Sequence, residues 1–106
     1  MKITLRVTGG VTGPVGAVVR EFDLAALPAA ERAQAEPLIA AARVFDRPAK
    51  QMVASPKPQD FRYQLDVTDE ARSSQLTFQL AAVDAAMRAL VDWIEDHVAP
   101  VSAGAR

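Results

Sequence analysis

Three stretches of the chain alternate apolar and polar residues, which predicts β-strands with one buried face. They cover residues 2–8, 61–67 and 74–80. In the first stretch, Ile3, Leu5 and Val7 share one face. A fourth stretch, residues 17–22, is rich in β-forming residues and can pair with the first as a hairpin. The polar residues 68–73 predict the turn of a second hairpin.

Residues 24–45 are rich in alanine and predict a helix. Pro28 and Glu31 suit its first turn, because proline is tolerated there and a carboxylate complements the helix dipole. Pro37 lacks a backbone donor, so we expect either a kink at this point or two short helices. The residues expected to share the buried face are Leu27, Ala30, Leu38, Ala41, Ala42 and Phe45.

Residues 83–98 carry the clearest helical pattern in the chain. Asp84 is a plausible N-cap for this helix. We interpret Trp93 and Tyr63 as core residues, the alternative being that Trp93 and the Phe61–Tyr63 pair form a binding patch. The apolar residues that recur at helical spacing are Val83, Ala86, Met87, Leu90, Val91, Trp93, Ile94 and Val98.

The elements therefore follow one another in the order β-β-α-β-β-α. Since two hairpins can merge into one sheet, we expect an α+β fold, with a four-stranded antiparallel sheet and two helices packed on one face. The prolines within residues 47–59 predict an extended loop. We expect residues 1–99 to form a single α+β domain and residues 100–106 to form a flexible C-terminal tail.

Composition and charge argue against several classes of protein function. With 106 residues, 12 basic and 13 acidic side chains, the chain carries a net charge of −1, which argues against a nucleic-acid binder. The absence of cysteine excludes disulfides, thiolate catalysis and iron–sulfur clusters. No apolar run reaches the roughly 18 residues of a membrane helix, and the beginning has no signal-peptide core. We therefore expect a cytoplasmic protein without a membrane partner.

Catalytic chemistry has little support in the sequence. The single histidine, His97, can serve as a base or metal ligand, but no second ligand type clusters near it, so a helix-end position is the better interpretation. Asp92, Glu95 and Asp96 match no calcium loop and suit a solvated helix face. We therefore predict a protein that is not an enzyme, with no catalytic residue, no bound metal and no cofactor.

Four of the five glycines gather in the first predicted hairpin loop, at positions 9, 10, 13 and 16. Their spacing matches neither a phosphate loop nor a dinucleotide fingerprint, no lysine follows, and a strand rather than a helix comes next. Two interpretations remain. The stretch is either a wide turn without a partner, or a binding loop displayed on a rigid scaffold.

Five segments, by their order and spacing, resemble the emfourin family over nearly the whole chain. They are ITLRV running into Gly9 and Gly10, FDLAALPAAER, LIAAARVFDRP, DFRYQLDVTDE and AAMRALVDWI. Emfourins are small bacterial inhibitors of protealysin and related thermolysin-like zinc proteases. The resemblance implies tight, reversible inhibition of such a metalloprotease, with the zinc belonging to the protease and not to this chain.

An inhibitor of this kind must fill the protease cleft, and we predict that the first hairpin loop does so. Glycines permit close backbone approach, and Pro14 limits the freedom lost on binding. The predicted protease-binding loop is Gly9, Gly10, Val11, Thr12, Gly13, Pro14 and Val15.

One valine cannot provide such an affinity alone. Burying it contributes about 1.5–3 kcal/mol, whereas nanomolar binding needs about 12 kcal/mol. A second surface must contribute, and its candidates are Pro56, in the loop of residues 48–58, and Phe61 with Arg62 at a strand start. Whether the first hairpin loop or the loop of residues 48–58 enters the cleft stays open.

A function of a different class is also compatible with the sequence. The chain can be a non-enzymatic interaction module, or a homo-oligomeric domain without inhibitory activity, that uses a sheet edge or the last helix. For the inhibitor we expect a monomer when it is free of its protease.

Overall fold

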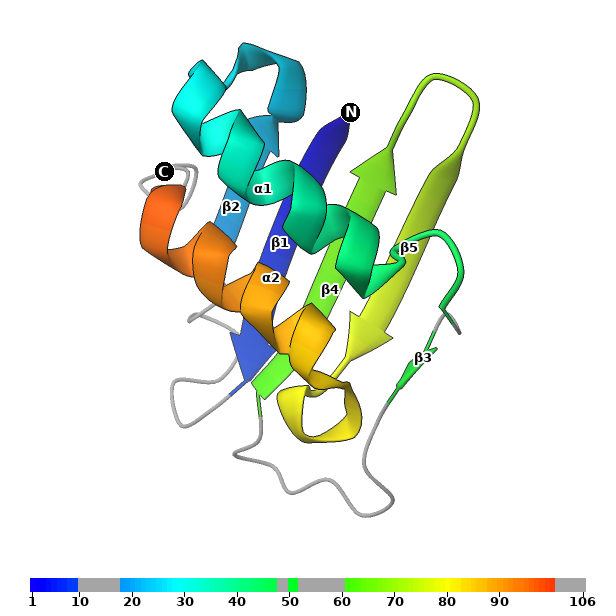
Figure 1. The fold of residues 1–106 in the computed structure, drawn as a ribbon. Helices are drawn as coiled ribbons and strands as arrows, with labels where there is room; N and C mark the ends of the chain where they lie inside the picture. Colours follow the sequence, from blue (N-terminus) through cyan, green and yellow to red (C-terminus); the bar gives the residue numbers. More distant parts are fainter. Residues whose placement is uncertain (10–17, 48–49, 52–60, 101–106) are drawn as a thin grey trace.

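The computed structural model describes residues 1–9, 18–47, 50–51 and 61–100. Its main elements follow the predicted order apart from one added short strand, β3, and Figure 1 shows their arrangement. They are β1 (Lys2–Gly9), β2 (Val18–Asp23), α1 (Ala29–Ala42), β3 (Lys50–Gln51), β4 (Phe61–Thr68), β5 (Ser73–Phe78) and α2 (Ala85–His97), with 3-10 turns at Leu24–Ala26 and Leu80–Ala82.

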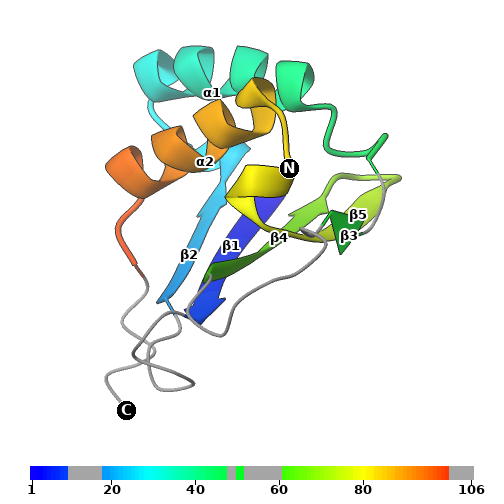
Figure 2. The same cartoon turned by 90° about the horizontal axis from the view of Figure 1, so that it is seen from below.

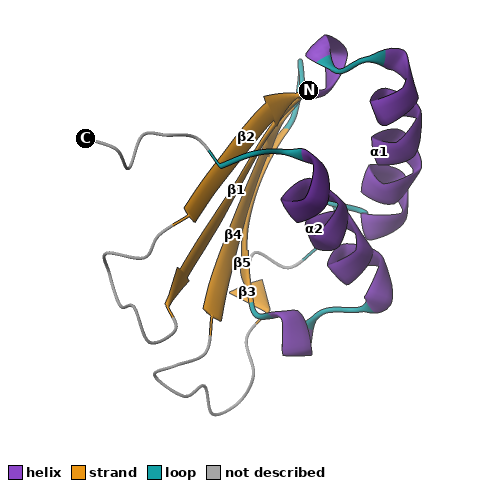
Figure 3. Cartoon of the chain, turned by 90° about the vertical axis from the view of Figure 1, so that its left-hand side faces the viewer, coloured by secondary structure: helices purple, strands orange, loops and turns teal. Residues whose placement is uncertain are grey.

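The strands form one sheet in the order β2-β1-β4-β5-β3. The four predicted strands are antiparallel to their neighbours, which confirms the four-stranded α+β prediction. The short strand β3 adds a parallel pairing to β5, in a stretch for which the sequence predicted an extended loop. Two residues carry no periodicity, so no sequence pattern could indicate this pairing. Both helices cover the same face of the sheet, and no helix of the described residues lies on the other face (Figure 3).

The core lies between this covered face and the helices. Alternate residues of β1 and β4, among them Leu5 and Leu65, are fully buried, as their strand pattern requires. On the helix side, the core contains the buried side chains of Met87, Leu90 and Ile94 from α2. Tyr63 and Trp93 are both buried, which confirms their interpretation as core residues.

Helix α1 differs from its prediction in two respects. It runs without interruption across Pro37, so the expectation of two short helices is wrong. The proline is exposed and so is Ala33, whose carbonyl loses its helical donor and can be solvated by water.

The predicted buried face of this segment is only partly correct: Ala42 is buried, and Leu27, Leu38 and Phe45 are partly buried and pack against the core. The residues that α1 buries are Ala35, Ile39 and Ala42, while Ala30 and Ala41 are exposed. In so alanine-rich a segment the faces differ little in hydrophobicity, so the contact with the rest of the core decides which one is buried.

Helix α2 agrees closely with its prediction. Asp84 is its N-cap, and the carboxylate accepts a hydrogen bond of 3.1 Å from the Met87 backbone N–H. A 2.7 Å ion pair with Arg47 holds the same carboxylate from the segment after α1. These two contacts keep the pKa of Asp84 below its usual range. Among the described residues, no helix has the length and apolar character needed to cross a membrane.

Candidate functional site

The described residues that flank the two candidate loops, residues 10–17 and 52–60, lie at one end of the sheet. Strand β1 ends there at Gly9, which pairs with Phe61, the first residue of β4. Strand β2 begins there at Val18, opposite Val7. We call this end, at the bottom of Figure 1, the loop end.

The second candidate loop is attached at the same end. The chain leaves β3 at Gln51, which lies opposite Phe78, and Phe78 in turn lies opposite Tyr63 near the start of β4. It re-enters the sheet at Phe61. The described residues that flank segments 10–17 and 52–60 therefore lie at the same end of the sheet.

Three of the predicted site residues are described, and all three lie at the loop end. Gly9 and Phe61 are paired across β1 and β4, and Arg62 is exposed opposite Thr8. The other predicted site residues lie outside the described residues; they are Gly10, Val11, Thr12, Gly13, Pro14, Val15 and Pro56.

Phe61 stands out among the described residues as the exposed large apolar side chain, with 53% of its surface accessible. It continues the inward-facing row of Tyr63, which is only 7% exposed. Its partner across the strand pair is Gly9, which has no side chain to cover the ring. An uncovered aromatic ring beside a glycine leaves apolar area that a partner protein can bury.

The residue that follows Phe61 on the same face of β4, Tyr63, is packed in the core. The Tyr63 ring stacks on Phe78 with 5.6 Å between ring centroids and 15° between the planes. Burial raises the pKa of the Tyr63 hydroxyl, and the carboxylates of Glu95 and Asp92 raise it further. Tyr63 is therefore neutral at physiological pH and acts as a packing residue.

The helix-end interpretation of His97 agrees with its position. Its ring stacks on Trp93 at 4.7 Å, and Nδ1 lies 3.0 Å from the Trp93 carbonyl oxygen. Because a carbonyl only accepts, Nδ1 carries the proton in this hydrogen bond. Within the described ranges, no group of three or more His, Asp and Glu side chains could hold a metal ion.

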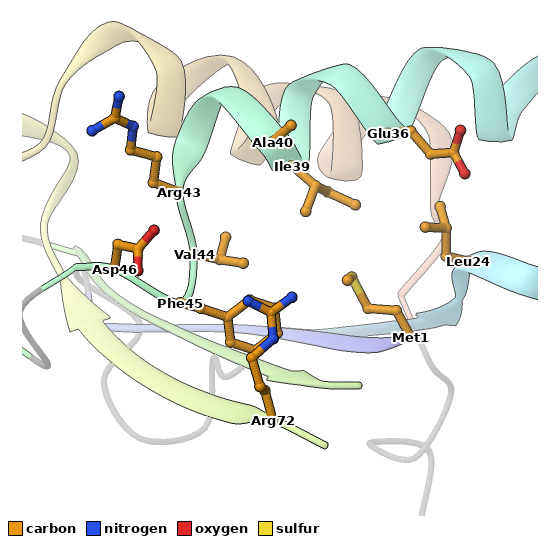
Figure 4. Close-up of a pocket in the computed structure, with 10 residues that line it drawn as sticks. All are labelled: Met1, Leu24, Glu36, Ile39, Ala40, Arg43, Val44, Phe45, Asp46 and Arg72. Carbon is orange, nitrogen blue, oxygen red and sulfur yellow. The ribbon is translucent and has the colours of Figure 1, made fainter. Parts of the chain in front are cut away.

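A pocket of about 380 Å³ lies away from the loop end, near the start of β1 and the end of α1 (Figure 4). Phe45 lines it, and the Arg72 guanidinium lies 4.1 Å from the centroid of the Phe45 ring. Ile39 and Met1 supply more apolar lining, while Glu36, Arg43 and Asp46 bring charges of both signs. The three described site residues, Gly9, Phe61 and Arg62, do not border this pocket. Sequence patterns did not indicate the pocket because its lining comes from distant segments.

Comparison with known proteins gives one finding. The model of the family described as Emfourin matches residues 5–95. The match begins within β1, ends within α2 and covers all the elements between them. Searches of curated proteins and of solved structures found no match.

Proposed function

Because this chain belongs to the Emfourin family, a family of inhibitors, we propose that it inhibits thermolysin-like zinc proteases such as protealysin. The family match over residues 5–95 is the observation that carries the proposal. In this proposal the loop end enters the protease cleft and competes with substrate. The catalytic zinc belongs to the protease, and this chain contributes shape and apolar contact.

The pairing of the central strands supports the loop end as the inhibitory surface. Strands β1 and β4 are paired over eight positions, from Lys2 opposite Thr68 to Gly9 opposite Phe61. This pairing fixes Gly9, which precedes the first candidate loop, next to Phe61, which follows the second. Fixed attachment points lower the conformational entropy lost on binding.

The energetics require more than one contact. Complete burial of a Phe side chain contributes about 1.5–3 kcal/mol, and the ring of Phe61 has about half of its area left to bury. Phe61 then contributes about 0.8–1.6 kcal/mol of the about 12 kcal/mol that nanomolar inhibition needs. We propose that Gly10, Val11 and Thr12 supply part of the remainder, together with the other predicted contact residues.

The experiment is an inhibition assay with purified protealysin-like and thermolysin-like enzymes. A variant in which residues 10–12 are replaced by a short polar turn is expected to lose inhibition while keeping its thermal unfolding midpoint. The matched control replaces Glu70 and Ala71, which are exposed in the β4–β5 turn at the opposite end of the sheet, and it should inhibit normally. Full inhibition by the first variant would show that this loop is not the inhibitory segment. No inhibition by the natural chain would refute the proposed function.

A further inference from the structure

The sheet face opposite the helices is segregated by charge. Strand register places its side chains in rows across the sheet. The two rows nearest the loop end hold three basic residues and no acidic one; these residues are Arg6, Lys50 and Arg62, with Thr8, Val19, Gln64 and Thr77 between them. The two rows at the far end hold the acidic residues Glu21, Asp23 and Asp66 together with Lys2. We call Arg6, Lys50 and Arg62 the basic half.

The acidic residues of this face are neutralised or hydrogen-bonded within the chain. Lys2 lies 3.7 Å from the Glu21 carboxylate, and the Thr4 hydroxyl donates to it at 3.1 Å. Asp66 accepts from the Gln64 amide at 3.4 Å. Asp23 lies 3.8 Å from the N-terminal amine, so Glu21 and Asp23 are paired with cations, whereas Asp66 keeps its charge and has a hydrogen-bond partner.

The basic half has no such compensation. All three side chains are exposed, and within the described part of the chain none forms an ion pair or a hydrogen bond. Lys50 and Arg62 line one shallow hollow with Gln75 and Thr77. Since the whole chain has a net charge of only −1, this positive patch is a local arrangement and not a consequence of overall charge.

The basic half is continuous with the loop end. Arg62 follows Phe61 directly, and successive strand residues point to opposite faces, so these two side chains lie on either side of the end of β4. Figure 2, which looks at the molecule from below, shows both helices on one side of the sheet, so they leave the face that carries Arg62 uncovered. A protein that covers Phe61 and the loops can reach the basic half without meeting a helix.

The face lacks the features of a nucleic-acid platform. Single-stranded nucleic acid is bound by stacking on exposed aromatic rings, and none of the residues assigned to this face by strand register is aromatic. Arg62 and Arg6 instead flank threonine and glutamine side chains, which suit a polar protein rim.

We infer that the basic half docks on an acidic surface of the protease beside its active-site cleft. The inference rests on the proposed function and adds the partner's chemistry to it. Two of the cations, Arg6 and Arg62, are diagonal neighbours on β1 and β4, so they act on one region of the partner. Exposed charges of this kind mainly accelerate association, and salt screens them over a Debye length of about 10 Å at 0.1 M.

The test measures association and dissociation rates of the natural chain and of the double variant R6E/R62E with an inhibited protease. In low salt, at about 20 mM NaCl, the double variant is expected to associate about ten-fold or more slowly, and the difference should shrink towards 0.5 M NaCl. R6K/R62K, which keeps the charge, should associate at close to the natural rate. R88E is the matched control, because Arg88 is exposed on α2 on the opposite side of the molecule.

The outcomes separate the two proposals. If the natural chain inhibits and R6E/R62E associates as fast as R88E at every salt concentration, the docking inference is wrong and the proposed function stands. If the natural chain inhibits no thermolysin-like protease, the proposed function fails and the docking inference fails with it. Binding of a labelled oligothymidylate that R6E/R62E abolishes, without any change in protease association, would also overturn the inference in favour of a nucleic-acid site. Circular dichroism melting verifies that each variant is folded.

Discussion

Replacing Phe61 by alanine tests whether the loop end is the inhibitory surface. The ring is 53% exposed in the free protein, so a protease that covers it removes roughly half of a phenylalanine side chain from water. At about 1.5–3 kcal/mol for complete burial, the covered half contributes about 0.8–1.6 kcal/mol. A factor of ten in affinity corresponds to about 1.4 kcal/mol, so F61A should raise the inhibition constant about 4- to 15-fold.

The same substitution also removes the part of the ring that is already buried in the free protein, so the free energy of unfolding should fall by about 0.7–1.4 kcal/mol while the variant stays folded. The assay is steady-state inhibition of a thermolysin-like protease, with urea unfolding of each variant measured alongside. Y63F is the control, since Tyr63 is 7% exposed on the same row and has no comparable area left to bury. An inhibition constant for F61A within two-fold of the natural value, measured on a folded variant, would refute the assignment of Phe61 to the interface.

Two further predictions concern stability. P37A should raise the free energy of unfolding, measured by urea titration, by about 2 kcal/mol. A proline inside a helix costs about 3 kcal/mol, and part of this cost is offset because proline also restricts the unfolded chain. An unchanged unfolding midpoint would contradict this account of α1. D84A should be less stable than the natural chain at pH 7, whereas D84N should keep much of the cap, since its side-chain oxygen can still accept from the Met87 N–H. The folded-state pKa of Asp84 is lowered from 3.8, so its stabilisation is present above that value and is lost as pH falls through the lowered pKa. Thermal melts between pH 2 and 7 should therefore show the D84A deficit shrinking in acid, and a constant deficit would exclude ionic stabilisation by this carboxylate.

The four longer strands and α2 could be predicted because their buried residues recur at the regular spacing of a strand or a helix. Leu5 and Leu65 are buried since every second residue of a strand faces the helices, and Leu90 and Ile94 share a face of α2 at helical spacing. The N-cap at Asp84 was also a local signal, because a short polar side chain there meets the free N–H groups of the first turn.

The candidate site was only partly accessible from the sequence. Gly9 and Phe61 were singled out separately, one for backbone freedom and the other as a strand start. Their pairing depends on β1 lying next to β4, which the alternating pattern does not specify. Nor could the pattern indicate that Arg6, Arg62 and Lys50 share one half of one face, since they come from three strands.

The sequence by itself determined which segments become the four longer strands and the two helices, because these follow from residue type and spacing along one element. It also excluded cysteine chemistry. Tertiary structure alone decided the strand order, the buried face of α1 and the position, at one end of the sheet, of the residues that flank both candidate loops. The physical reason is that these features depend on contacts between residues far apart in the chain. In α1 the alanines made several faces nearly equivalent, so packing against the core selected Ala35, Ile39 and Ala42.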